Sequence, residues 1–227
     1  MGTDNKPEVQ TSSGLPKIDK AANYKQPVII SLVGQAICLG IGAGIYFVGN
    51  RDKSDALMSS IIANDQHYMY LAGALIGTTV RFVNMFPMIH KARIMTGKGS
   101  ESIGKNLRSN PYIYQMVDAP GAPGSKNSIV FQNDGAAGEY NRSNRSLHHM
   151  VENMGAMLLG VPLAGYVFPF PTFVSSLVWA VGRVWHQVGY ASGYGSHGGG
   201  FMFATLATNA VEGMLLVVAL RGFGFFN

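Results

Sequence analysis

Cysteine and charge are both scarce in this sequence. Among 227 residues there is one cysteine, Cys38, so no disulfide can form within the chain and no oxidised scaffold is implied. Only 13% of the residues are charged, against about 25% in an ordinary soluble domain, whereas 47% are hydrophobic. A dense basic stripe is also lacking despite the net charge of +5, which argues against nucleic acid as a partner. The composition is typical of a protein embedded in a lipid bilayer.

The N-terminal segment, residues 1–26, lacks the features of a targeting sequence. It contains neither the apolar core of a signal peptide nor the arginine-rich pattern of a transit peptide. Its residues are polar and mixed in charge, which predicts a tail with no core of its own.

Five segments are long and apolar enough to cross a bilayer, which requires about 20 residues each. They are 28–48, 68–90, 146–168, 172–190 and 201–220. The sequence therefore predicts an all-α membrane protein with one N-terminal spanning helix over 27–49, four further spanning helices over 66–221 and a long loop over 97–140. In the first span, Ala36, Gly40 and Gly44 have the small-xxx-small spacing that favours close helix packing.

Lysine and arginine are concentrated in the tail and in the long loop between the second and third spans. With five spans these two segments lie on the same side of the membrane. Because positive loops stay on the cytoplasmic side, we expect the tail and the long loop on the cytosolic side, or on the matrix side of a mitochondrial inner membrane. The endoplasmic reticulum is the other organelle compatible with this orientation.

Two polar clusters interrupt the apolar spans. The third span carries Arg145, His149 and Glu152 at i, i+4 and i+7, and therefore on one helical face. The fourth span repeats this arrangement, again on one face, with Arg183, His186, Gln187 and Tyr190. Because the two spans are antiparallel, both clusters lie near the same membrane side, where Arg93 at the end of the second span also falls.

This set of residues predicts a cationic cleft with one carboxylate, suited to a small anionic or zwitterionic ligand. In the alternative interpretation, Glu152 forms ion pairs with Arg145 and Arg183 that only fix the bundle. Intramembrane charge favours a functional site. For a second pair of charges within the spans, Arg81 and Glu212, we expect a mutual ion pair.

A metal site is not predicted, although His148 and His149 are adjacent. Neighbouring residues on a helix point about 100° apart, so the two imidazoles cannot easily share one ion. His186 and His197 are the other histidines that such a site would need.

Four stretches of the sequence resemble the MAPEG family of membrane-bound glutathione transferases and leukotriene synthases, and the microsomal glutathione transferase branch in particular. They are HKARIMTG (90–97), NPYIYQ (110–115), YNRSNRSLHHMVE (140–152) and VGRVWHQVGYASG (181–193). The last two resemble the family's Phe-Asn-x-x-x-Arg-x-x-x-Asn-x-x-Glu and Gly-Arg-x-x-Tyr-x-x-Gly-Tyr motifs. They occur in the family's order over about two thirds of the chain.

The resemblance implies a MAPEG-like four-helix bundle that assembles as a homotrimer and binds glutathione between subunits near the cytosolic face. By the same resemblance, the arginines would bind carboxylates or brace the site, Glu152 would bind the ligand's amino group, and Tyr190 would contact its cysteine moiety. The implied ligand-binding residues are Arg93, Arg145, His149, Glu152, Arg183, His186 and Tyr190.

The sequence departs from the family pattern at several of these positions. His149 stands in place of the motif's Asn, and His186 in place of its first Tyr. The arginine that activates the thiol in the synthases has no match near the start of the last helix, where His197 is the nearest polar residue. Arg183 and His197 are thus the residues expected to stabilise a thiolate, whose free pKa is about 8.5.

Two functions remain open on these residues. One is a glutathione-dependent enzyme that conjugates lipophilic electrophiles or reduces peroxides. The other is a catalytically decayed homologue that serves as an accessory subunit of a larger respiratory or photosynthetic membrane complex, which the extra helix, the longer loop and the changed site residues favour. A transporter or channel is disfavoured, because the sequence shows no repeat or pair of broken helices.

Overall fold

The structure is a computed structural model that describes residues 21–95, 111–118 and 127–225. The greater part of the predicted tail, much of the long loop and part of the NPYIYQ stretch lie outside these residues. The described part is mostly helical.

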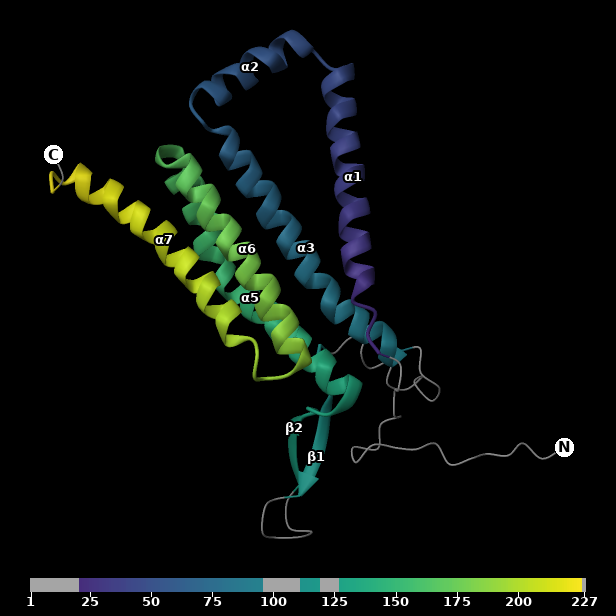
Figure 1. Cartoon of the computed structure of the whole chain (residues 1–227). Coiled ribbons are helices and arrows are strands. Elements are labelled where there is room, and N and C mark those ends of the chain that lie inside the picture. Colours follow the sequence, from purple (N-terminus) through teal and green to yellow (C-terminus); the bar gives the residue numbers. More distant parts are fainter. Residues whose placement is uncertain (1–20, 96–110, 119–126, 226–227) are drawn as a thin grey trace.

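Within the described residues, six helices and two strands follow one another (Figure 1). They are α1 (Lys25–Val48), α2 (Arg51–Ala63), α3 (His67–Met95), β1 (Tyr114–Asp118), β2 (Asn127–Phe131), α5 (Gly135–Val167), α6 (Pro169–Ser192) and α7 (Gly198–Gly222). A single residue, Phe168, separates α5 from α6, so these two helices form the antiparallel hairpin expected from the sequence.

Four helices, α1, α3, α5 and α7, are long and apolar enough to cross a membrane, which supports an integral membrane protein. The segment predicted as the fourth span also forms a helix, α6, but it is not among these four. The reason is its position, because α6 packs against α3, α5 and α7. The face it buries among them carries polar residues, namely Thr172, Ser176, Arg183, His186 and Gln187.

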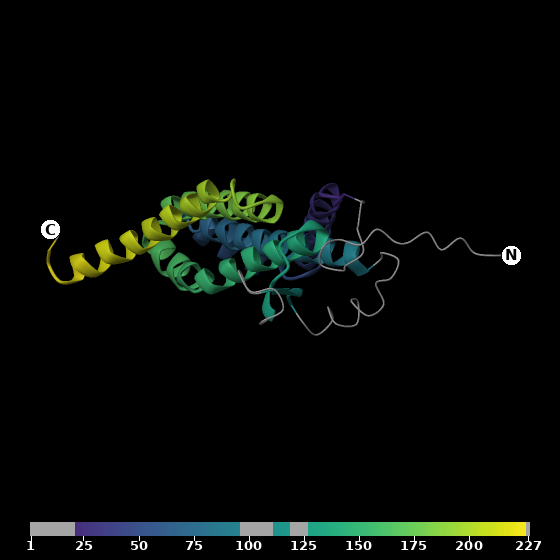
Figure 2. The same cartoon turned by 90° about the horizontal axis from the view of Figure 1, so that it is seen from below.

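The bundle core lies where α3, α5, α6 and α7 meet (Figure 2). Its largest fully buried side chains include Trp179, Met150 and Met157, with Val83 and Val211 from the flanking helices. Two glycines allow α6 and α7 to approach closely. A Cβ added at Gly200 would lie 2.4 Å from the backbone nitrogen of His186, and one at Gly182 would lie 2.6 Å from that of Ala204.

Helix α1 stands apart from this core. It packs on α3 and on α2, and Pro27 is its only buried residue among those described. The ring of Tyr24, just before α1, lies against Phe86 and His90 of α3. The predicted small-residue face is not used within this chain, because Ala36, Gly40 and Gly44 are exposed. Helix α2, capped by the side chain of Asn50, was not expected and connects α1 to α3.

The expectation of an all-α chain is wrong for part of the long loop. Strands β1 and β2 pair antiparallel, with Tyr114 opposite Phe131, and α5 begins eleven residues before the expected start of the third span. Tyr, Met, Val, Ile and Phe in the two short runs favour strand pairing. The loop therefore contains a hairpin that continues into an extended α5.

Candidate functional site

The lower part of the bundle, where α5 and α6 meet the start of α7, brings most of the predicted site residues together. His149, His186 and Tyr190 stack with ring centroids 5.4 Å apart in each successive pair. His197 meets Tyr190 edge-on at 4.7 Å. The Nδ1 atom of His186 lies 2.8 Å from Oγ of Ser146, which ties α6 to α5.

Arg183 is buried in this cluster, with only 4% of its surface exposed. Its Nη1 atom lies 3.4 Å from Nδ1 of His149, and its guanidinium lies 6.0 Å from the ring centroid of Trp179. Its Nε atom is buried and has no hydrogen-bond partner among the described residues. A buried cation normally has an anionic partner, because desolvation penalises an isolated charge.

Arg145 and Glu152 form an ion pair along α5, with Nη1 of Arg145 2.9 Å from Oε1 of Glu152. Both side chains are about half exposed, so the pair is accessible from outside the bundle. The second pair considered from the sequence is not formed, because in this part of the chain Arg183 lies beyond ion-pair distance of Glu152.

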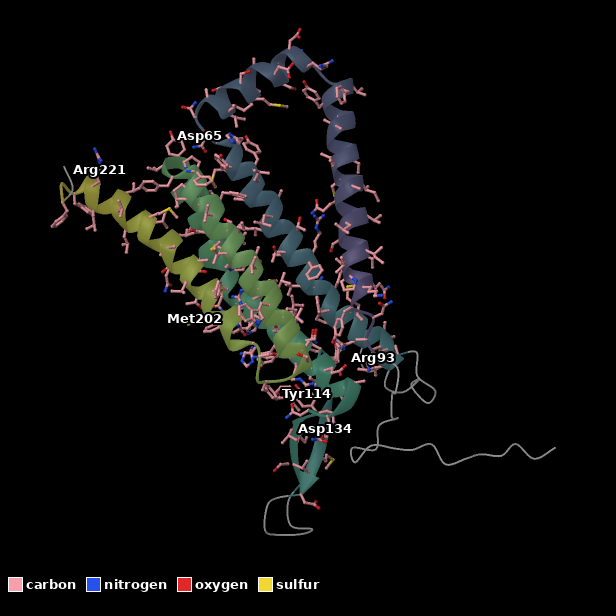
Figure 3. The ribbon with its side chains drawn as sticks, viewed as in Figure 1. Asp65, Arg93, Tyr114, Asp134, Met202 and Arg221 are labelled. Carbon is pink, nitrogen blue, oxygen red and sulfur yellow. The ribbon has the colours of Figure 1, made fainter. Side chains whose placement is uncertain are left out.

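Arg93 is placed elsewhere. At the lower end of α3, where Figure 3 labels it, its guanidinium forms an ion pair with Glu139 of α5. The Nδ1 atom of His90 lies 3.4 Å from the same carboxylate oxygen. The structure thus uses Arg93 in a contact between α3 and α5, apart from the cluster of Arg145 and Arg183.

Two hollows open beside the cluster. One, of about 270 Å³, is lined by Arg145, Tyr190, Phe201 and the histidines 149, 186 and 197. The other, of about 300 Å³, lies between α5 and α7 and is lined by both Glu152 and Arg183, together with Asn209 and Glu212. The predicted residues other than Arg93 therefore border one or the other hollow.

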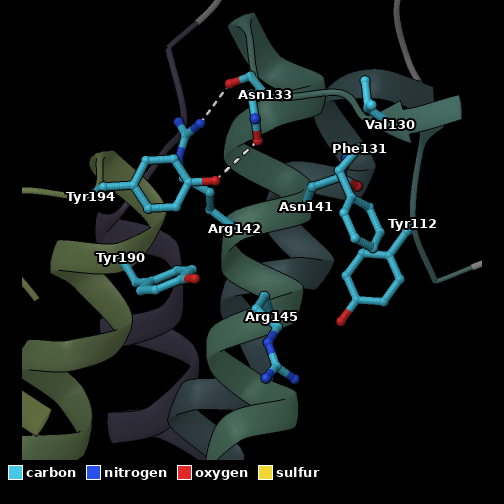
Figure 4. A pocket seen from close by; sticks show the side chains of 9 residues that line it. All are labelled: Tyr112, Val130, Phe131, Asn133, Asn141, Arg142, Arg145, Tyr190 and Tyr194. Carbon is cyan, nitrogen blue, oxygen red and sulfur yellow. Dashed lines mark hydrogen bonds between the residues drawn. The ribbon is translucent and has the colours of Figure 1, made fainter. Parts of the chain in front are cut away.

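A third and larger hollow, of about 400 Å³, adjoins the first and shares Arg145 and Tyr190 with it (Figure 4). Its other lining residues, which the sequence analysis did not single out, include Tyr112, Phe131, Arg142 and Tyr194. Arg142 donates to the carbonyls of Asn133 and Ala191, and its guanidinium lies over the ring of Tyr194. Arg142 lies three residues before Arg145, a spacing that places both on one face of a helix, and the sequence could have indicated Arg142 in this way.

Tyr112 closes this third hollow on the side of the hairpin. Its hydroxyl lies 2.7 Å from Nδ1 of His148, and its ring meets that of Phe131 edge-on. Burial raises the pKa of Tyr112 above its ordinary value of 10.0, and the positive charge of Arg145 opposes the shift to a smaller extent. The phenol therefore stays protonated.

The adjacent histidines point to different neighbours, as the helical geometry predicts. His148 faces Tyr112 at the hairpin, whereas His149 faces Arg183 and His186. Among the described residues, no group of three His, Cys, Asp or Glu side chains is placed to hold a metal ion.

The expected ion pair between Arg81 and Glu212 is wrong. Arg81 lies between α3 and α1, where its guanidinium contacts Sγ of Cys38 at 3.7 Å and Oγ1 of Thr78 at 3.4 Å. Glu212 lies on α7, which packs on α5 and α6 at the other edge of the bundle. The two charges are thus on opposite flanks, because α5 and α6 separate α3 from α7.

Comparisons with known proteins identify no relative. No family model matches the chain, no curated protein matches it, and no solved structure matches its fold.

Proposed function

We propose that this chain is an integral membrane protein that binds a small anionic thiol, of which glutathione is the leading candidate, beside Arg183. The observation that carries the proposal is the burial of Arg183, which has no carboxylate partner among the described residues, at the edge of a hollow large enough for a ligand. A carboxylate or thiolate in that hollow would supply the missing negative charge, and the burial of Arg183 would strengthen the interaction.

The membrane arrangement that goes with this proposal has five spans, with α6 crossing alongside α1, α3, α5 and α7. The exposed face of α6 is apolar, whereas about half of the residues on its buried face are polar, which favours lipid around this helix. The exposed residues are Val174, Leu177, Val181, Trp185 and Val188. Because only Phe168 separates α5 from α6, the chain turns back directly after α5, which favours a second crossing of the membrane by α6.

The ligand's charges have complements around the first two hollows. Arg183 and Arg145 would bind carboxylates, and Glu152, which is half exposed, would bind an ammonium group. The thiol would lie near Arg183 or His197, since Nδ1 of His197 is buried and has no hydrogen-bond partner in the part of the chain that the structure describes. A cation or a hydrogen-bond donor there would favour the thiolate, the nucleophilic form.

As an enzyme, the protein would let this thiolate attack a lipophilic electrophile or peroxide that arrives through the bilayer. The MAPEG resemblance supports this chemistry and a homotrimeric assembly. Under that proposal His149, His186 and Tyr190 shape the thiol's surroundings by stacking, whereas Arg93 braces α3 against α5 through Glu139.

Isothermal titration calorimetry with glutathione tests the proposal on purified, folded protein in nanodiscs. We expect binding heat for the wild type, a loss of affinity of about tenfold or more for Arg183→Gln, and no change for the exposed Arg221→Gln. Absence of binding heat in wild-type protein would overturn the proposal.

The second candidate function, an accessory subunit of a larger membrane complex, is favoured by α1. This helix leaves a long apolar surface uncovered, with Leu39, Ile45 and Val48 among its most exposed residues. Purification from native membranes in a mild detergent distinguishes the two functions. A stable assembly with unrelated chains, together with no response to glutathione, supports the accessory role.

A further inference from the structure

Two opposite charges, Arg81 and Glu212, face outward in the apolar spans of this protein. Both side chains are exposed, although each lies in a helix long and apolar enough to cross a membrane. In the part of the chain that the structure describes, Arg81 has only the neutral contacts to Cys38 and Thr78, and no side chain there forms a hydrogen bond or ion pair with Glu212. Exposed charges at that depth are costly in lipid, so both need partners.

The two charges lie at matching heights in the bundle. Arg81 is at the midpoint of α3, 14 residues after His67 and 14 before Met95. Glu212 is 14 residues after Gly198, where α7 begins at the same end of the molecule as the end of α3 (Figure 1). At 1.5 Å per residue, each lies roughly 21 Å along its helix from that end. Arg81 is equally far from the other end of α3, and Glu212 is 10 residues, roughly 15 Å, from the other end of α7. Both distances exceed the reach of the side chain to the headgroups.

The surroundings of the two charges are complementary as well. Beside Arg81, α1 presents the exposed small residues Ala36, Gly40 and Gly44, which permit close approach of another helix. Around Glu212, the hollow between α5 and α7 is lined by polar groups, among them Thr205, Thr208 and Asn209. Arg183 borders the same hollow but lies beyond ion-pair distance of Glu212.

We infer that a second copy of this chain covers each flank, so that Arg81 of one copy pairs with Glu212 of the next. Arg81 contacts Cys38 of α1 and Glu212 lies on α7, and these two helices are at opposite edges of the bundle (Figures 1 and 2). Such a contact is heterologous: its repetition closes a ring where the rotation between copies allows, and otherwise extends as an open row. The inference rests on these two residues and does not depend on any ligand at Arg183.

The single cysteine makes this contact directly testable, because Cys38 lies 3.7 Å from Arg81. We place a second cysteine one turn from Glu212, as Thr208→Cys, and oxidise the protein in membranes. Disulfide-linked dimers and higher species are expected. They should vanish in the Thr208→Cys variant that also carries Cys38→Ser. A matched control is Val218→Cys, an exposed position on another face of α7, which should not cross-link.

Charge reversal provides the second measurement. Association of labelled copies in nanodiscs is expected to weaken roughly tenfold or more for Arg81→Glu and for Glu212→Arg. The double variant R81E/E212R should recover to within about threefold of the wild type, which shows that the loss is not a folding defect. The control is Arg221→Glu, the same change of charge at the end of α7, which should leave association unchanged.

Three results would overturn the inference. They are a wild type that stays monomeric in nanodiscs, cross-linking no greater for Thr208→Cys than for Val218→Cys, and a double variant that associates no better than the single ones. Association with an unrelated chain in place of a second copy would overturn it too.

Discussion

Asn141 of α5 binds both backbone polar groups of Ile113, as a neighbouring strand would. Its Oδ1 atom accepts from the Ile113 nitrogen at 2.8 Å, and its Nδ2 atom donates to the Ile113 oxygen at 2.7 Å. The same Nδ2 also donates to the carbonyl of Gln132 at 2.8 Å. One buried side chain therefore fastens both ends of the hairpin to α5 and positions the wall of the hollow shown in Figure 4.

Replacement of Asn141 by Leu should detach the hairpin. The substitution removes all three of these hydrogen bonds, and we expect a loss of roughly 3 kcal/mol in the free energy of unfolding. Thermal unfolding in detergent and the rate of proteolysis between residues 111 and 134 measure the effect. The control is Asn153→Ala, an exposed position whose amide donates only to the carbonyl of its own helix. Equal stability of the two variants would contradict the assignment.

Replacement of Gly200 by Ala should force α6 and α7 apart. The added Cβ would lie 2.4 Å from the His186 backbone, which cannot move as a flexible side chain would. We expect a destabilisation of about 1–3 kcal/mol, the usual range for overpacking. Gly213→Ala is the matched control on the same helix, because nothing lies within 4 Å of its Cβ position. If both variants unfold at the same temperature, the close crossing of the two helices is wrong.

Glu152→Gln should leave stability nearly unchanged and alter ligand choice. Exposed ion pairs contribute little to stability, so the loss of the contact with Arg145 should not shift Tm noticeably. Under the proposed function, glutathione should bind more weakly, whereas 3-mercaptopropionate, which lacks an ammonium group, should not. Calorimetry with both thiols measures the difference. An equal loss of affinity for the two thiols would show that Glu152 does not contact the amino group.

The ionisation of the Tyr112 phenol should have its midpoint above pH 10. Burial raises the pKa of this group in the folded state, so the folded protein holds the proton more tightly than the unfolded chain does. This contribution to stability is complete below the unfolded pKa and is lost as the pH rises through the folded pKa. The difference in absorbance at 295 nm between wild type and Tyr112→Phe measures the ionisation. A midpoint at or below 10.0 would show that Tyr112 is solvated.

The sequence by itself determined the membrane class, the apolar helices and the two polar faces on α5 and α6. Each depends on residues a few positions apart, and helical periodicity alone places Arg145, His149 and Glu152 together. It also anticipated the tight α5–α6 hairpin, because only Phe168 lies between the two helices. The family likeness and its ligand remain predictions.

Only the tertiary structure decided which charges meet. Ion pairs between helices depend on how the helices are rotated and ordered in the bundle, which periodicity does not specify. Arg93 therefore pairs with Glu139 instead of joining Arg183, and Arg81 and Glu212 lie on opposite flanks. The hairpin could not be predicted from the sequence for a similar reason, because its attachment to α5 depends on a contact between Asn141 and Ile113, which are 28 residues apart.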